Sequence, residues 1–375
     1  MSNRLIKTLM AVSAAALAAI VVTTQAQAQA GLENAKKLLA ESKTIPAFKD
    51  PGPAFNAKQC MTGKKMFVIP LASQNPFNVQ VANAMKDAAK LVGFDLAIWE
   101  NQMQLPQWVQ GMQQAIAQNY NVIDLQGGIP PAALPAQIRE ARAKGIKVTT
   151  THLYDVTQKA DDVDGSIKTD YTRAGQIMAA WAINETGGKV NAVIMGSDEI
   201  VPTAPFVKSI QDYLNANCPG CKHIYRNVPV AEWGTKIASE LQAAMQADAG
   251  VNMFMPIYDN MLQFGVQPVR VMGKTGQVKF VSYNGSANML DLQRTELDNR
   301  GIKIANVGES LGWVGLAGVD YNMRLLCNVQ RSEVINTPLY LFDETNIRNA
   351  GVPAEYNKGY GDAHIPAFRR LWQLN

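Results

Sequence analysis

The stretch that decides the fold is Lys65-Met-Phe-Val-Ile-Pro-Leu71-Ala-Ser73-Gln-Asn75-Pro76-Phe77. Residues 65–71 form an apolar run of strand length. Asn75-Pro76 then marks a helix start, because proline suits the first turn of a helix, and apolar residues recur at helical spacing from Val81 to Val92. A buried strand that leads into an amphipathic helix is the repeating unit of parallel α/β sheets.

The same unit recurs along the chain. Further strands are expected at 94–99, 122–125 and 146–151, and then, after residue 170, at 190–195, 223–228, 251–255, 278–282 and 302–307, with helices between them. One of these helices is expected over 258–266. The alternation predicts an α/β protein of two similar, doubly wound parallel-sheet lobes. Ligands of such sheets bind beyond the carboxyl ends of the strands, so the residues that follow each strand are the candidate site.

Composition agrees with a folded protein of this size. Of the 375 residues 47% are hydrophobic and 18% are charged, with a net charge of +4. At about 100–200 residues per domain, the length suggests two domains. No basic cluster stands out, so a nucleic-acid partner is not expected.

Residues 1–30 have the pattern of a cleaved secretory signal peptide. Arg4 and Lys7 precede an apolar run, and the segment closes in alternating alanines, with the expected cut after Ala28 or Ala30. The apolar run is shorter than the roughly 20 residues that span a bilayer, which argues against a membrane anchor. Residues 31–60 are expected to form an N-terminal extension, and the mature protein is expected in the periplasm.

The four cysteines are even in number and would lie in an oxidising compartment. Cys218-Pro-Gly-Cys221 has the spacing of a redox pair or of half a zinc site, but a disulfide within a loop is favoured, because a second such motif is missing. Cys60 and Cys327 would then form the other pair, although four cysteines admit three pairings.

No cofactor or metal is expected. The three histidines are scattered, and neither a phosphate-binding loop nor a dinucleotide motif occurs.

Five motifs at predicted strand ends and helix starts carry a resemblance. They are Ser73-Gln-Asn75-Pro76-Phe77, Ile167-Lys-Thr-Asp170-Tyr-Thr-Arg-Ala-Gly175, Pro256-Ile-Tyr258-Asp259-Asn-Met, Ser282-Tyr283-Asn284-Gly285 and Gly315-Leu-Ala-Gly318-Val-Asp320. In this order and spacing, over about residues 64–340, the chain resembles the type I periplasmic solute-binding proteins of ABC importers, in the ribose- and galactose-binding cluster.

The resemblance implies two lobes joined by a hinge of three crossovers. The first lobe would hold residues 61–169 and 310–338, and the second would hold 170–309 and 339–375 with the C-terminal tail. It also implies a non-catalytic receptor that captures a small solute (a sugar, a polyol or a small cyclic or aromatic compound) and delivers it to an ABC permease. A chemoreceptor is a further expected partner, and a monomer is the expected state.

The resemblance also carries over a set of pocket positions. They fall on Ser73, Asn75, Phe77, His152, Phe206, Ile257, Tyr283, Asn284 and Glu309. Tyr154, Tyr258 and Trp313 join this set as aromatic residues near predicted strand ends or helix starts. The chain has His152-Leu153 where sugar binders place an Asp-Arg pair, and Phe206 where they place an arginine. The pocket is therefore expected to be more aromatic and less charged than a monosaccharide site.

Structural roles compete with these assignments. Asn75 suffices as a helix cap and Phe77 as the apolar staple of that helix. His152 could be an ordinary strand-end histidine, Asn284-Gly285 favours a turn, and Glu309 could be an acid at a helix start.

The alternative function is a secreted serine hydrolase. Gly308-Glu309-Ser310-Leu311-Gly312 matches the G-x-S-x-G pattern between a predicted strand and helix. Asp343 and His364 follow in the order of a Ser, acid and His triad. Against this alternative, too little chain follows Gly312 for the strands and helices that normally surround such a serine.

Overall fold

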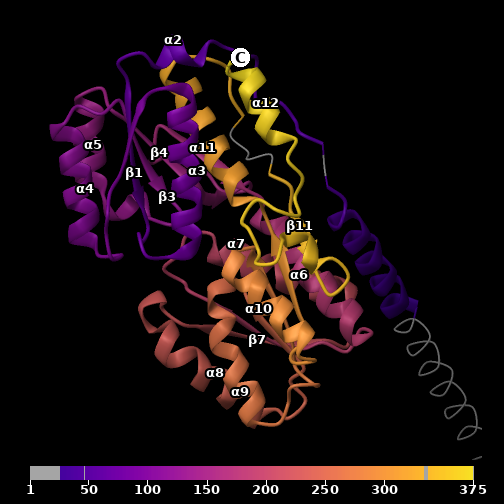
Figure 1. Cartoon of the computed structure of the whole chain (residues 1–375). Coiled ribbons are helices and arrows are strands. Elements are labelled where there is room, and N and C mark those ends of the chain that lie inside the picture. Colours follow the sequence, from indigo (N-terminus) through magenta and orange to yellow (C-terminus); the bar gives the residue numbers. More distant parts are fainter. Residues whose placement is uncertain (1–25, 46, 333–336, 375) are drawn as a thin grey trace, which may run out of the picture.

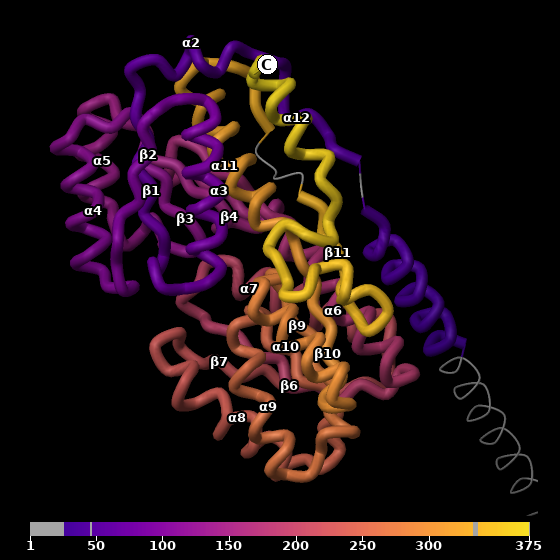
Figure 2. The backbone as a smooth tube through the Cα atoms, in the orientation of Figure 1, coloured from indigo at the N-terminus to yellow at the C-terminus, as the bar shows by residue number. Residues whose placement is uncertain are grey.

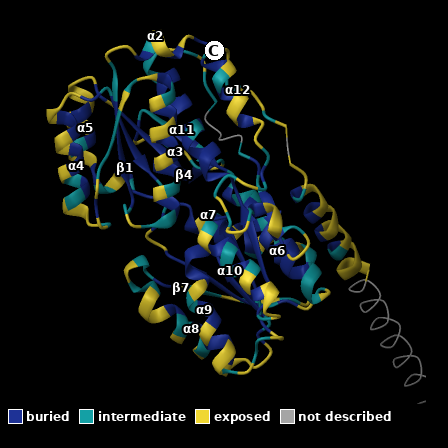
Figure 3. Ribbon diagram, in the orientation of Figure 1, coloured by how far each residue is buried: buried dark blue, intermediate teal, exposed yellow. Residues whose placement is uncertain are grey.

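The structure, a computed structural model, describes residues 26–45, 47–332 and 337–374 and consists of two α/β lobes (Figure 1). Strands and the inner faces of helices are buried in both lobes, while the outer helix faces are exposed (Figure 3). No helix within the described residues is both long enough and apolar enough to cross a bilayer.

The first lobe is built on a five-stranded parallel sheet in the order β2-β1-β3-β4-β5. Its strands are β1 (Lys65–Pro70), β2 (Asp95–Ile98), β3 (Val122–Gln126), β4 (Lys147–Asp155) and β5 (Gly165–Thr169). The central β3 is buried along its whole length, as expected for a strand covered on both faces.

The second lobe repeats this plan. Its sheet has the order β11-β10-β9-β8-β6-β7. The strands are β6 (Asn191–Gly196), β7 (Lys222–Asn227), β8 (Met253–Pro256), β9 (Lys279–Asn284), β10 (Ile304–Gly308) and β11 (Tyr340–Phe342). All pair in parallel except β11, which is antiparallel to β10. Without β11, both sheets have the same doubly wound order, which confirms the predicted fold class.

Helices cover both faces of the first sheet. They are α3 (Pro76–Val92), α4 (Leu105–Ala117), α5 (Pro135–Ala143) and α11 (Leu311–Leu326), with the short α2 (Ala57–Met61) and the 3-10 turn η1 (Pro131–Ala133). Helices α3 and α11 approach each other closely at Gly315. A Cβ atom there would lie 2.7 Å from the Val81 carbonyl oxygen and 2.6 Å from the Ala84 Cβ, so only glycine fits.

The second sheet is covered in the same way. Its helices are α6 (Tyr171–Thr186), α7 (Thr203–Asn217), α8 (Trp233–Ala247), α9 (Gln263–Val271) and α10 (Ala287–Asp298), with the 3-10 turns η2 (Val230–Glu232), η3 (Asp259–Met261) and η4 (Ile347–Ala350). Gly175 of α6 faces Ser209 of α7, whose Oγ would lie 2.0 Å from an added Cβ, so this helix pair also depends on a glycine.

Strand β5 and the region of helix α9 differ from the sequence-based expectation. Strand β5 was not expected, because Gly165-Ser-Ile-Lys-Thr169 lacks a long apolar run. The helix expected over 258–266 is instead the turn η3 followed by α9, which continues through Pro268 to Val271. Pro268 lies on the buried face of α9, where packing offsets the hydrogen bond that proline cannot donate.

The chain passes between the lobes three times within the region of the resemblance. The passages are from β5 to α6, from β10 to α11, and from α11 to β11, the last through residues that are in part outside the described ones. This arrangement agrees with a three-crossover hinge. The expected signal peptide falls on residues 1–30, of which 1–25 lie outside the described residues.

Both ends of the chain make further passages. Helical residues 26–42 place Ala35, Leu38 and Leu39 in the core of the second lobe, whereas α2 packs in the first lobe. At the other end, β11 belongs to the second sheet, but α12 (His364–Leu371) packs on α11 of the first lobe. The two end segments run along the same side of the molecule (Figures 1 and 2).

The last helix corrects the sequence-based division of the chain. That division placed all of 339–375 with the second lobe, yet Phe368, Leu371 and Trp372 are buried in the core of the first lobe. The amphipathic face of α12 finds its partner on α11 because Trp313 and Ala317 are available there. We call residues 43–45 with 47–56, and residues 343–363, which link the two lobes, the terminal straps.

Candidate functional site

A cavity of about 60 Å³ lies where residues that follow strands of both sheets meet. Its lining residues are Leu71, Ala72, Asn75, Phe77, Asn78, Met103, Gly127, Gly128, His152, Tyr171, Ile200, Pro202, Val230, Trp233, Tyr258, Asn260 and Asn284. Several of them follow β1 and β3 in the first lobe and β6 and β8 in the second. These are the positions where strand order reverses in each sheet, and ligands of doubly wound folds bind there.

The first-lobe wall is arranged by the start of α3. Asn75 caps this helix, and its Oδ1 accepts hydrogen bonds from the backbone N–H of Phe77 at 2.9 Å and of Asn78 at 3.4 Å. Asn78 in turn donates from Nδ2 to Gln126 Oε1 at 3.3 Å. Gly127 has a φ of +74°, and an added Cβ would lie 2.2 Å from Asn78 Nδ2, so the turn after β3 requires glycine.

His152 lies at the back of the cavity, at the centre of a buried polar cluster that joins the lobes. Its Nε2 contacts Glu309 Oε1 and lies 3.2 Å from the Tyr283 hydroxyl, while its Nδ1 lies 2.8 Å from the Tyr171 hydroxyl. Tyr283 also donates to Glu309 Oε1. We call these four residues the hinge cluster. One member comes from the first lobe and the others from the second lobe and the β10–α11 crossover, so the cluster links the lobes at the hinge.

The two tyrosines of the hinge cluster are held in their protonated form. Burial, and next the charge of Glu309, raise the pKa of Tyr171 and of Tyr283 well above the ordinary value. Their hydroxyl groups therefore remain donors.

The second-lobe wall is aromatic and rests on a buried carboxyl group. Tyr258 stacks on Trp233 with ring centroids 6.2 Å apart, and its hydroxyl lies 2.8 Å from Thr203 Oγ1. The neighbouring Asp259 accepts hydrogen bonds from Ser286 N at 2.7 Å and from Asn306 Nδ2 at 3.4 Å. Burial raises the pKa of Asp259 to about 7 despite these bonds. Asp259 thus ties the loops after β8 and β9 to β10.

The twelve residues expected in the pocket divide into three groups. Those that line the cavity are Asn75, Phe77, His152, Tyr258 and Asn284. Those that contact a lining residue but do not line the cavity are Tyr283 and Glu309, through His152, and Phe206, through Tyr171. Those that belong to other contacts are Ser73, Tyr154, Ile257 and Trp313. Their role in binding remains a prediction.

The last group has clear structural roles. Ser73 Oγ accepts from the Asn101 backbone N–H at 2.7 Å, and Tyr154 donates to Asp162 at 2.8 Å. Ile257 is a buried core residue of the second lobe. Trp313 stacks between Phe48 and His364 in the core of the first lobe, away from the cavity. These four do not reach the cavity, because proximity to a strand end in sequence does not determine the direction of a side chain.

Other lining residues were not expected. Asn260 and Trp233 follow strand ends, and Asn78 lies one helical position after Phe77. Their positions after strands are the signal that could have identified them. Tyr171 lies in the second of the five motifs, at a lobe crossover, but was not among the twelve expected pocket residues.

The residues of the hydrolase alternative do not form a triad. Ser310 caps α11, accepts from Trp313 N at 3.2 Å and donates to Asn357 Oδ1 at 3.2 Å. Asp343 binds Thr345 and Lys43. Neither ring nitrogen of His364 has a hydrogen-bond partner within the described residues. The serine, acid and histidine are therefore not connected as a catalytic relay requires.

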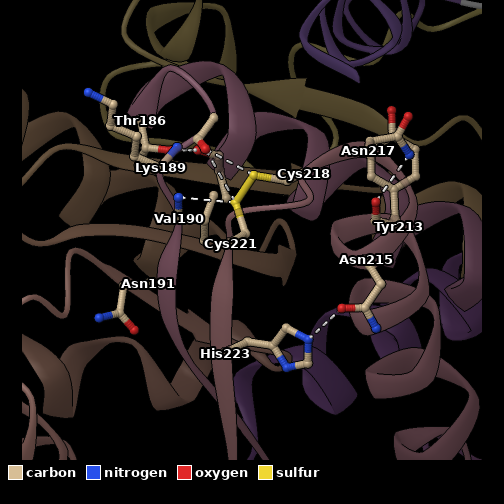
Figure 4. The surroundings of a disulfide bond; sticks show 12 residues. Thr186, Lys189, Val190, Asn191, Tyr213, Asn215, Asn217, Cys218, Cys221 and His223 are labelled. Carbon is tan, nitrogen blue, oxygen red and sulfur yellow. Dashed lines mark hydrogen bonds between the residues drawn. A yellow bond between two sulfur atoms is a disulfide. The ribbon is translucent and has the colours of Figure 1, made fainter. Parts of the chain in front are cut away.

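The cysteines form two disulfides, Cys60–Cys327 and Cys218–Cys221, which are the pairs favoured from the sequence. The second lies before β7 and beside the start of β6, where Cys221 Sγ accepts from Val190 N at 3.2 Å (Figure 4). His223 turns toward Asn215 instead of toward the sulfur atoms (Figure 4). No group of three His, Cys, Asp or Glu side chains suited to a metal ion occurs in the part of the chain that the structure describes.

Two doubly wound lobes that face each other across such a cavity define a hinged, two-lobed binding protein. The sequence profile of the family described as "Periplasmic binding protein domain" matches residues 66–298, which is more than half of the chain. The chain therefore belongs to the periplasmic binding protein family, whose members are solute-binding transport proteins. A comparison with curated protein sequences finds no match.

Solved structures of ABC-transporter solute-binding proteins share the fold. The 5-methylthioribose transporter solute-binding protein of Thermotoga lettingae is 17% identical, with a TM-score of 0.67 over 82% of this chain and 92% of that chain. The Caulobacter myo-inositol binding protein is 15% identical, with a TM-score of 0.65 over 76% and 96% of the two chains. An ABC sugar transporter subunit of Rhodobacter sphaeroides is 15% identical, with a TM-score of 0.65 over 76% and 99%. At these identities the likeness establishes the fold alone.

Proposed function

We propose that the chain is the periplasmic substrate-binding component of an ABC importer and that it captures a small solute in the cavity between its lobes. The observation that carries this proposal is the cavity itself, which is lined by residues after strands of both sheets and lies against the hinge cluster. A solute held by both walls would stabilise the closed state, and a membrane permease would recognise that state.

The fold relatives support a small solute. Their structures hold 5-methylthioribose, allitol and myo-inositol. We infer for this chain a solute of similar size, with Asn75, Phe77, Tyr258 and Asn284 in contact with it and His152 at the back of the site. Phe206, Tyr283 and Glu309 would support these contacts from behind.

The proposal includes export, state and partners. Residues 1–30 would be removed on export, and the mature chain would act as a monomer with the permease and a chemoreceptor as partners. The lobes would comprise 61–169 with 310–338, and 170–309 with 339–363, with α12 added to the first. Catalysis is not part of this function, because Ser310, Asp343 and His364 are engaged in separate contacts.

Capture can be tested by measuring lobe closure. Labels at Gln114→Cys on α4 and Ser239→Cys on α8, both exposed, would report the distance between the lobes by pulsed electron spin resonance. The mature protein is first screened by thermal shift against allitol, myo-inositol, 5-methylthioribose and neutral cyclic compounds, because a ligand of the native state raises the apparent stability. We expect a stabilising compound to shorten the distance between the labels. A compound that binds without shortening it would contradict the proposal.

The site assignment has its own test. Phe77→Leu keeps an apolar side chain in the core but removes the aromatic face, so we expect about tenfold weaker binding of the stabilising compound, which is about 1.4 kcal/mol. Val79→Ala, on an exposed position of the same helix, is the matched control and should leave the affinity unchanged. Equal affinities of the wild type and Phe77→Leu would remove Phe77 from the site.

A further inference from the structure

The walls of the cavity combine apolar side chains with the neutral amides of asparagines. Among the described residues that line it, none is Asp, Glu, Lys or Arg. Aliphatic and aromatic side chains form most of the surface, namely Leu71, Met103, Ile200, Pro202, Val230, Phe77, Trp233 and Tyr258. An ionised group that moved from water into this site would have no opposite charge to pair with, and such a transfer costs several kcal/mol.

Several of the polar groups on the walls are already engaged within the protein. Both ring nitrogens of His152 bind hinge-cluster partners, so the imidazole presents its ring to the cavity next to Phe77, with centroids 4.6 Å apart. The Tyr258 hydroxyl binds Thr203, and Trp233 Nε1 donates to Ser197 Oγ at 2.9 Å. These aromatic residues therefore contribute mainly apolar surface.

Asparagine side chains supply the remaining hydrogen-bonding capacity. Within the described residues, the side-chain amides of Asn260 and Asn284 make no hydrogen bond to the protein, and Asn75 uses only its oxygen. Each amide offers donors beside an acceptor. Groups that pair with such an edge are a carboxamide or two neighbouring hydroxyls, whereas a ring with a hydroxyl on every carbon would bury more polar groups than these amides can satisfy, at about 1–3 kcal/mol for each unsatisfied group.

We propose that the cavity selects a compact, neutral ring compound that has an apolar face and one polar edge, either a carboxamide or a diol. This proposal rests on the proposed capture function. The apolar face lies between Phe77 and the Tyr258–Trp233 pair, and the polar edge meets the asparagines. Charged compounds and fully hydroxylated rings bind more weakly. The cavity of about 60 Å³ favours a small ligand, since one water needs roughly 10–15 Å³ by the same measure.

Two matched pairs of probes test the chemical class on the full mature chain. Nicotinamide and nicotinate differ in charge at nearly equal size, and cyclohexane-1,2-diol and myo-inositol differ in the number of hydroxyls on one ring. Titration calorimetry should give the neutral amide and the diol Kd values at least about tenfold lower than those of their partners. If nicotinate or myo-inositol binds as tightly as its partner, the proposed class is wrong.

The distance between the spin labels on α4 and α8 distinguishes failure of the proposed ligand class from failure of the capture function. Closure on myo-inositol but not on the diol would overturn the neutral-apolar class and leave capture intact. If none of the four probes binds at millimolar concentration, the proposed class is overturned, and capture is then decided by the wider screen alone.

Two substitutions test the walls separately. Val230→Thr replaces a methyl group of the apolar wall by a hydroxyl of nearly the same shape. We expect the affinity for the diol to fall several-fold and the affinity for myo-inositol not to fall. Asn260→Asp replaces an amide donor by a negative charge and should weaken the binding of nicotinamide about tenfold. The control Asn215→Asp, at an exposed position of α7, should leave the affinity for nicotinamide unchanged. An equal effect of Val230→Thr on both ring alcohols, or no effect of Asn260→Asp, would contradict the assigned contacts.

Discussion

His152 shows how much of this site is determined by single residues. Its φ of 61° is in the left-handed region, which costs a residue with a side chain roughly 1–2 kcal/mol, and this conformation aims the imidazole at the second lobe. Hydrogen bonds to Glu309, Tyr283 and Tyr171 offset that cost. His152 thus serves as a joint between the lobes, and its ring forms part of the wall beside Phe77.

Asp259 gives a pH prediction at the same scale. Its pKa in the folded protein is about 7, whereas an unfolded chain has a value of about 3.9. Between these pH values the folded state binds more protons than the unfolded state, so the contribution of Asp259 to stability falls as the pH rises from about 4 to about 7. Asp259→Asn keeps an acceptor for Ser286 N and removes the titration.

Urea unfolding at several pH values checks this prediction. We expect Asp259→Asn to gain stability relative to the wild type as the pH rises from 5 to 8, by an amount on the order of 2–3 kcal/mol. Asp212→Asn, at an exposed position of α7, is the control and should show no such trend. A difference between Asp259→Asn and the wild type that does not vary with pH would contradict the assigned ionisation.

Single residues also mark the limit of prediction from sequence. Asn75 and Phe77 were predictable because a helix cap fixes the direction of both the cap and the first turn. Trp313 and Tyr154 were placed near the pocket because they lie near a helix start or a strand end, yet they point to Phe48 and Asp162. The conformation of His152 depends on partners up to 157 positions away in the chain, which no local pattern encodes.

At the scale of elements, the strands with apolar sequences and the helices between them could be predicted from the periodicity of hydrophobic residues. The parallel, doubly wound class of both sheets also followed, because strand and helix alternation permits few arrangements. Strand β5 was missed because its polar sequence forms a strand only by pairing with β4. The extent of α9 was missed because a proline usually ends a helix, and tertiary packing prevails here.

The disulfide between α2 and the end of α11 is expected to contribute more to stability than the disulfide between Cys218 and Cys221. It joins residues 267 positions apart, so its loss frees a very long loop in the unfolded chain. In the chain-entropy account this is worth about 5–6 kcal/mol, against much less for the loop closed by Cys218 and Cys221.

Thermal unfolding of paired serine variants compares the two disulfides. We expect Cys60→Ser with Cys327→Ser to lower the melting temperature by several degrees more than Cys218→Ser with Cys221→Ser. If the two double variants melt together, the long-range disulfide does not stabilise the first lobe in the way its position implies.

At the scale of the whole molecule, the terminal straps tie the lobes together outside the three crossovers. In the N-terminal strap, Lys43 pairs with Asp343, where the C-terminal strap leaves β11 of the second lobe, and Phe48 stacks on Trp313 of the first lobe. Asp50 and Arg370 connect the two ends of the chain at 2.6 Å. The division of the C-terminal tail between the lobes was not predictable, because the apolar face of α12 could match a helix of either lobe.

Trp372 tests the attachment of the last helix. It is fully buried, and its Nε1 donates to Asp320 Oδ1 at 2.7 Å. We expect Trp372→Ala to destabilise the protein by about 3–5 kcal/mol, because it leaves a cavity and removes the hydrogen bond to Asp320 Oδ1. Ile365→Ala, on the exposed side of the same helix, should stay within about 1 kcal/mol. A similar small loss in both variants would show that α12 is not part of the first-lobe core.

The straps also set an order of assembly. A chain is synthesised from its N-terminus, and domains generally fold as their segments become available. The first lobe contains β1 near the beginning, α11 far along the chain and α12 at the end. Its core therefore cannot close until the last helix has been made, whereas the second sheet can pair most of its strands earlier. The first lobe is therefore the last to be completed, because α12 follows every element of the second sheet in the chain.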